Sequence, residues 1–176
     1  MKKVLSALLL TLAVLGLALG AYAEEEADTL MLELNIQAVK ANLDDHELHY
    51  TQQGDQNDVF KLNYNLDGTL NSGKLWIFVY DDGVRFEADY DVSATEEVRG
   101  ELAAYLSELN SKLRMCSFYL EEDGTIGNGY FLYTDLQVPT QDILGDCRVT
   151  VLSNLESYSE AIADILYGGK TAAEVL

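Results

Sequence analysis

The stretch Gly73–Tyr90, GKLWIFVYDDGVRFEADY, decides the fold. Two runs rich in β-branched and aromatic residues flank Asp82-Gly83, a pair suited to a two-residue type I′ turn because both central residues of that turn need φ > 0. The predicted cross-strand pairs are Asp81 with Val84, Val79 with Phe86, Ile77 with Ala88, and Leu75 with Tyr90. Because side chains alternate between the faces of a strand, one face is expected in the core: Leu75, Ile77, Val79, Phe86, Ala88 and Tyr90.

The other face of this hairpin is a candidate binding surface. It carries a row of three aromatic residues beside charged residues, a composition typical of the centre of a protein interface. Two interpretations are open. A later helix covers the row and makes a second core, or the row binds a protein partner or a second copy of the chain. The predicted partner-binding residues are Trp76, Phe78, Tyr80, Arg85 and Glu87, with Asp89 at the border.

Helices precede, interrupt and follow the remaining strands. Helical spacing of apolar residues predicts a helix over 28–43 and a second that begins at the capping box Ser93–Glu96 and runs to about Lys112. A third, long helix has start signals at Pro139–Asp142 and is stopped by Gly168-Gly169. Strand alternation appears over 47–53, 58–66, 74–90, 114–122 and 125–136. The expected fold is therefore α+β, an antiparallel sheet of about six strands in the order α-β-β-β-β-α-β-β-α with helices packed on it.

Glycines mark two further expectations. A second hairpin turns at Asp123-Gly124, which would set Phe118 opposite Gly129 and Leu120 opposite Gly127. Large side chains would then face positions that have none. In the middle helix, Gly100 lowers helix stability by about 1 kcal/mol relative to alanine and is a candidate close approach to the sheet.

The N-terminus has the organisation of a secretory signal peptide. Lys2-Lys3 precedes the apolar run Val4–Gly20, and Ala21-Tyr22-Ala23 forms an A-x-A cleavage site. The alternative is an uncleaved anchor helix, for which the run is short. We expect a signal peptide over 1–23, a single domain over 24–176, and an exported protein that is secreted, periplasmic or at the cell surface.

The chain is strongly acidic. Its 176 residues contain 30 Asp plus Glu and 11 Lys plus Arg, giving a net charge of −19. Removal of Lys2 and Lys3 with the signal would change this value to −21. Such a surface opposes binding to nucleic acid and anionic membranes, and favours solubility, cationic partners or loosely held divalent ions.

Cys116 and Cys147 would lie in an oxidising compartment after export, where a disulfide is permitted. Both lie on apolar faces of their predicted elements, so both are expected to point inward. A disulfide would close a loop of roughly 30 residues and stabilise the fold by about 3–4 kcal/mol. Two separate buried thiols are the alternative.

Catalytic motifs are weak. His46 and His49 lie close together at a helix-to-strand corner, which makes that corner the place for any metal site or small secreted hydrolase. There is no G-x-S-x-G motif, no phosphate-binding glycine loop and no basic patch. The segment Asn63–Gly68 resembles the start of an EF-hand, but position twelve of that loop would be Lys74 rather than a bidentate glutamate. No metal, cofactor or catalytic residue is predicted.

From Tyr50 to Leu176 the chain resembles the YbjN-domain family of bacteria, described as sensory transduction regulators with a type III secretion chaperone-like fold. The resemblance rests on the strands at 58–66 and 74–90, on the segment EVRGELAAYLSELNSKLRMCSFYLEEDGTI, and on VPTQDIL with YSEAIADILYGGKTAAEVL. It implies a non-enzymatic α+β domain that binds other proteins, with a homodimer among the options. The signal peptide departs from the cytoplasmic examples of that family.

Overall fold

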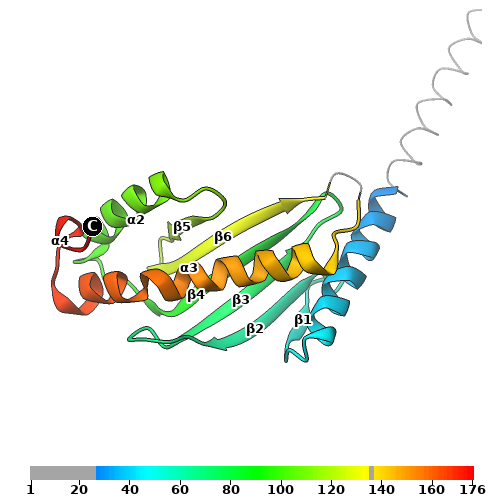
Figure 1. The fold of residues 1–176 in the computed structure, drawn as a ribbon, viewed down its shortest axis with the longest axis horizontal. Coiled ribbons are helices and arrows are strands. Elements are labelled where there is room, and N and C mark those ends of the chain that lie inside the picture. The colour runs from blue at the N-terminus through cyan, green and yellow to red at the C-terminus, as the bar shows by residue number, and fades with distance from the viewer. Residues whose placement is uncertain (1–26, 135–136) are drawn as a thin grey trace, which may run out of the picture.

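A computed structural model describes residues 27–134 and 137–176, so the predicted signal peptide lies outside the described residues. The described chain forms an N-terminal helix over 27–45, followed by three further helices and a six-stranded sheet (Figure 1). The elements after the N-terminal helix are β1 (Thr51–Gln53), β2 (Val59–Asn65), β3 (Ser72–Val79), β4 (Gly83–Ser93), α2 (Arg99–Lys112), β5 (Ser117–Leu120), β6 (Thr125–Tyr133), α3 (Gln141–Gly168) and α4 (Ala172–Val175). The predicted α+β class and element order are confirmed.

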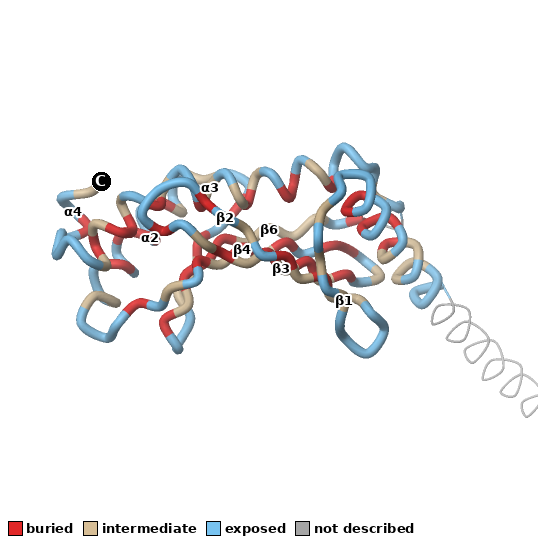
Figure 2. The backbone as a smooth tube through the Cα atoms, turned by 90° about the horizontal axis from the view of Figure 1, so that it is seen from below, coloured by how far each residue is buried: buried red, intermediate tan, exposed pale blue. Residues whose placement is uncertain are grey.

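The sheet and α3 form two layers. Strands run in the order β1-β2-β3-β4-β6-β5, and every neighbouring pair is antiparallel. The long helix α3 packs across β4 and β6, and Figure 2 shows it along one side of the sheet. The strand β6 is the neighbour of β4 although α2 and β5 lie between them in the chain, and β5 forms the edge of the sheet. We call the side of the sheet toward α3 the core face, and the opposite side the outer face.

The first hairpin has the predicted faces but another register. Val79 pairs with Val84 and Ile77 with Phe86, a shift of two residues from the prediction. A shift of two leaves every side chain on its face, so the predicted core residues are all buried, as expected. The turn residues are Asp81 and Asp82, neither with positive φ, and the predicted type I′ turn is wrong.

Contacts from distant segments set this turn. The side-chain amide of Asn35, in the N-terminal helix, donates to the carbonyls of Tyr80 (2.9 Å) and Asp81 (3.2 Å). Gly83 belongs to β4, and a Cβ there would lie 2.6 Å from the backbone oxygen of Leu132 in β6. The glycine is therefore needed for close strand packing and not for positive φ.

The second hairpin differs from the prediction by one residue. Gly124, with φ of 91°, is the last residue of a three-residue loop over 122–124. The loop is closed by the amide of Glu121, which donates to the carbonyl of Thr125. Phe118 consequently pairs with Asn128, and Tyr119 pairs with Gly127. A large side chain does lie opposite a glycine, as predicted, but the pair is Tyr119 with Gly127, and Tyr119 lies on the outer face.

The middle helix begins later than predicted. Ser93 stays in β4 and pairs with Thr125, so it caps no helix, and α2 starts at Arg99 without a side-chain cap. Sheet pairing thus prevails over the local capping-box signal. A Cβ on Gly100 would have nothing within 4 Å, so the expected close approach to the sheet is also wrong.

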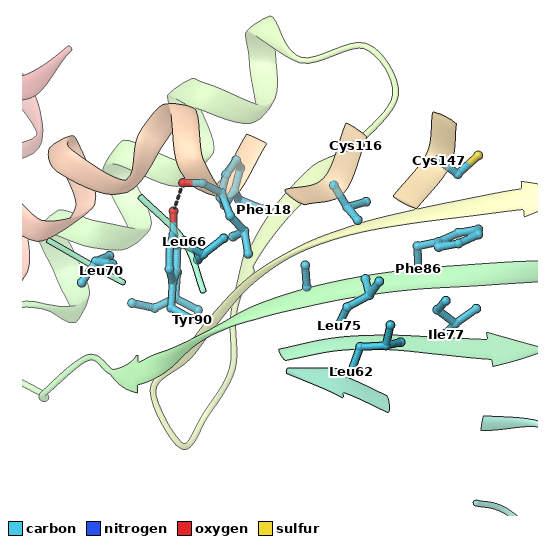
Figure 3. Packing of buried hydrophobic residues seen from close by; sticks show 14 of the residues in the cluster. Leu62, Leu66, Leu70, Leu75, Ile77, Phe86, Tyr90, Cys116, Phe118 and Cys147 are labelled. Atoms are coloured by element: carbon cyan, nitrogen blue, oxygen red, sulfur yellow. Dashed lines mark hydrogen bonds between the residues drawn. The ribbon is translucent and has the colours of Figure 1, made fainter. Parts of the chain in front are cut away.

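The core lies between the sheet and α3 (Figure 3). Tyr90 reaches across it, and its hydroxyl donates to the carbonyl of Leu155 in α3 at 2.5 Å. The ends of α3 follow the sequence signals: the Thr140 hydroxyl accepts from the amide of Ile143, and Gly169 ends the helix in the left-handed conformation. The core therefore joins strands β2 to β6 with α3, and residues of the N-terminal helix and of α2 complete it.

Candidate partner-binding face

The predicted binding residues lie on the outer face of the sheet. In the register of β2, β3, β4 and β6, Trp76 stands between Lys61 and Glu87, and Phe78 between Val59 and Arg85. Side chains on this face alternate with the buried ones of the core face. The outer-face residues used below are Lys61, Lys74, Trp76, Phe78, Arg85, Glu87, Asp89, Ser117, Tyr119, Gly127, Gly129, Phe131 and Tyr133.

Neither α2 nor α3 covers this face. Helix α3 packs on the core face, and α2 lies against the edge strand β5. There the side-chain amide of Asn110 donates to the carbonyl of Phe118 (2.8 Å) and its oxygen accepts from the amide of Phe118 (2.7 Å). Tyr133 remains 75% exposed and Tyr80 40% exposed. In the described chain the interpretation that a later helix buries the aromatic row is therefore wrong, while partner binding by it remains a prediction.

The aromatic row is longer than the sequence suggested. Trp76 and Phe78 stack with ring centroids 6.4 Å apart. The ring centroids of Tyr80 and Phe131 are 5.9 Å apart, and those of Phe131 and Tyr133 are 4.6 Å apart. The last two come from β6, and sequence reasoning missed them. Alternation places residues 131 and 133 on one face, but only the pairing of β4 with β6 brings that face beside Tyr80.

Two half-buried carboxylates interrupt the aromatic surface. Burial raises the pKa of Glu87; the neighbouring Arg85 guanidinium opposes this rise, while Asp89 and Glu121 add to it. Arg85 forms an ion pair with Glu87, and the Arg85 side chain is 50% exposed while that of Glu87 is 16% exposed. This part of the face therefore holds more negative charge than its one arginine neutralises.

Asp89 lies one pleat further along β4. It accepts a hydrogen bond from the hydroxyl of Tyr119, which fills the space above Gly127. Burial raises the pKa of Asp89, and hydrogen bonds from Tyr119 and Trp76 oppose the rise. Burial and the Asp89 carboxylate raise the pKa of Tyr119, so its hydroxyl stays a donor at neutral pH.

The outer face is hollowed where Gly129 lies opposite Glu87. The depression has a volume of about 330 Å³ and is lined by Arg85, Glu87, Met115, Ser117, Tyr119, Gly129, Tyr130 and Phe131. A second depression of about 340 Å³ lies between Lys74, Trp76, Asp89 and Asp91. The first combines a carboxylate with aromatic walls and suits a positively charged group, whereas in the second Lys74 already pairs with Asp91 at 2.6 Å.

The two cysteines point into the core, as expected. Cys116 precedes β5, Cys147 lies in α3, and both are buried free thiols in the structure. Burial raises the pKa of Cys147 to about 11, and the nearby Cys116 contributes to the rise. Burial also raises the pKa of Cys116. The disulfide between them stays a prediction.

The histidine corner is the C-terminal end of the N-terminal helix. His46 Nδ1 lies 2.8 Å from the carbonyl oxygen of Asn42, and Glu47 has a φ of 54° where the chain leaves the helix. The same carbonyl also accepts from the backbone amide of His46 (3.3 Å), so ring and backbone of His46 both contact the end of the helix. Among residues 27–134 and 137–176, no group of three or more His, Cys, Asp or Glu side chains could hold a metal ion. Nor does any helix within those ranges have the length and apolarity to cross a membrane.

Comparison with known families places this fold. A family model named YbjN and described as "Putative bacterial sensory transduction regulator" matches residues 35–164. The chain belongs to the YbjN family. The matched range contains the whole sheet and nearly all of α3, so it includes both the core and the outer face. A search of curated proteins found no match.

A solved structure shows the YbjN fold directly. It is described as "Crystal structure of YbjN, a putative transcription regulator from E. coli", and it aligns with a TM-score of 0.53 at 14% identity. The alignment covers 72% of this chain and 92% of that one. At this identity the likeness establishes the fold that the two YbjN chains share.

Proposed function

We propose that this protein is an exported, non-enzymatic domain that binds a protein partner through the outer face of its sheet. The observation that carries the proposal is the aromatic row from Trp76 to Tyr133, which neither α2 nor α3 covers. An exposed apolar patch with a polar border is a common mark of a protein interface. Membership of a family described as regulatory agrees with a binding role.

Export is the second part of the proposal. It rests on the basic start, the apolar run Val4–Gly20 and the A-x-A site at 21–23. Mass spectrometry of the exported protein should find a mature chain that begins at Glu24. A secreted or surface chain that retains Met1 would contradict cleavage.

Site-specific photo-cross-linking tests the binding face. A photo-reactive residue replaces Tyr133 on the outer face or, as a matched control, Val149 on α3; these side chains are 75% and 53% exposed. In the producing cells, position 133 should yield a discrete adduct that mass spectrometry identifies as a protein, and position 149 should not. Equal adducts at both positions, or none at 133, would refute a dedicated binding face.

A further inference from the structure

We infer that the depression beside Glu87 and Gly129 binds an arginine or lysine side chain from a basic segment of the partner. The inference rests on the proposed function and names the chemistry of the partner that the outer face takes. The depression, of about 330 Å³, is large enough for one long side chain at the low end of the range for ligand pockets.

The depression exists because Gly129 has no side chain. Gly129 pairs with Glu87 on β4 and with Ser117 on β5. The positions next to the Glu87 carboxylate therefore carry no side chain at Gly129 and a small one at Ser117. Aromatic walls come from Phe131, two residues further along β6, and from Tyr119 on the adjacent strand β5. A long side chain can therefore lie along the walls and bring its charged end to Glu87.

The local charge selects a cation. Asp89 and Glu121 both repel the negative charge of Glu87, and among the described residues Arg85 is the one cation that lines this depression. Arg85 is half exposed, so solvent screens its pairing with Glu87. A basic side chain from a partner would restore the balance of charge at this place and would be attracted by the net charge of −19.

The outer face already binds cations of its own in this way. Lys61 Nζ lies 4.8 Å from the ring centroid of Trp76. Arg85 stands between Phe78 and Phe131 in the register and pairs with Glu87. Aromatic faces attract arginine and lysine, and carboxylates add direction to that attraction. The intramolecular pairs show the contacts that a basic segment would reproduce.

Charge also argues against a second copy as the occupant. Two chains of net charge −19 repel each other, and pairing of their outer faces would bring both sets of carboxylates together. A basic segment gains from the same field. The inferred occupant is therefore a basic partner segment, and self-association is an outcome that would count against it.

Labelled synthetic peptides test the inference on the purified exported protein. Three short peptides alternate leucine with arginine, lysine or glutamate, and fluorescence anisotropy measures their dissociation constants. The arginine and lysine peptides should bind, and the glutamate peptide should not. Glu87→Gln should weaken binding of the arginine peptide about tenfold, because it removes the carboxylate that the cation reaches. Gly129→Ala should also weaken it: the added Cβ meets nothing closer than 3.6 Å, so it fits the fold but fills the depression.

Two matched controls separate the site from general attraction to an acidic protein. Glu156→Gln removes the same charge from the exposed side of α3 and should change affinity less than about twofold. Arg85→Ala should act in the opposite direction and tighten binding about threefold, because it removes the internal competitor for Glu87. Lys170→Ala removes an exposed, ion-paired positive charge just after the end of α3 and should change affinity less than about twofold.

Several results would overturn the inference. Equal weakening by Glu87→Gln and Glu156→Gln would show attraction to the overall charge alone. Weaker binding in Arg85→Ala would mean that Arg85 is no competitor, and light scattering that shows a dimer closed on the outer face would assign the face to a second copy. Thermal unfolding of each variant verifies that it is folded, and Arg85→Ala tests the site even if Glu87→Gln is unstable. A cross-link at position 133 together with no cation preference would leave the proposed function standing and reject only this inference.

Discussion

Asn110 closes the edge of the sheet at β5, and its replacement should destabilise the fold. Its side chain forms two hydrogen bonds with the backbone of Phe118, at 2.8 and 2.7 Å, in place of a further strand. An unpaired strand edge is prone to association with other chains, and native proteins often cover it with a helix. Asn110→Ala removes both bonds and leaves the amide and carbonyl of Phe118 to the solvent.

The expected loss follows from these two bonds. Each contributes about 0.5–1.5 kcal/mol net, which gives about 1–3 kcal/mol for the pair. Alanine is the better helix former by up to about 0.7 kcal/mol, which offsets part of that loss. A net destabilisation of about 1–2 kcal/mol corresponds to a lowering of Tm by roughly 2–8 °C in a domain of this size.

Urea and thermal unfolding followed by circular dichroism measure this change. Ser111→Ala is the matched control, because it removes an exposed hydroxyl that bonds only within α2, to the carbonyl of Glu108. It should shift stability by no more than about 0.5 kcal/mol. A Tm for Asn110→Ala within 1 °C of the parent, or an equal loss in Ser111→Ala, would refute the role of Asn110 at the edge.

Three further predictions concern other parts of the chain. Gly83→Ala should destabilise the fold by about 1–3 kcal/mol, because its Cβ would lie 2.6 Å from a backbone oxygen of β6. Gly100→Ala in α2 should stabilise it by about 0.5–1 kcal/mol, and thermal unfolding of the two variants should show Tm changes of opposite sign. The pKa of Glu87 is raised in the fold, so ionisation of Glu87 lowers stability as pH rises from the ordinary carboxyl pKa through the raised one. Urea titrations should therefore show Glu87→Gln gaining stability relative to the parent as pH rises above about 4.5, and a stability difference that does not change with pH would contradict this. Native Cys147 should react slowly with thiol reagents at pH 8, since a pKa of about 11 leaves about one thiolate in a thousand; fast modification of the folded chain would count against its burial.

Local periodicity predicted the faces of the sheet better than its pairings. The buried set around Ile77 and Phe86 follows from alternation with period two, which a register shift of two residues does not alter. The register itself depends on Asn35 and on the packing of Gly83 against β6, and both contacts are distant in sequence. The observed register of the hairpin at Gly124 differs from the predicted one by one residue, because its loop has three residues rather than two.

The candidate site could be predicted only in part for the same reason. Trp76, Phe78 and Tyr80 alternate within one strand, so their common face is visible in the sequence. Phe131 joins them through the pairing of β4 with β6, which skips over α2 and β5. The depression at Gly129 depends on the same pairing. A glycine leaves a hollow in a surface only where larger side chains surround it, and the sequence does not say which residues those are.

The length of α3 has a consequence for how the molecule opens. At 1.5 Å per residue its 28 residues extend about 42 Å, and it contacts β4, β6, α2 and α4 along that distance. Asn42 in the N-terminal helix also donates to the carbonyl of Gln141 at its start. Through these contacts α3 links β4 and β6 to α2, to α4 and to the N-terminal helix. Amide hydrogen exchange should therefore show α3 and the central strands opening together, as one cooperative unit.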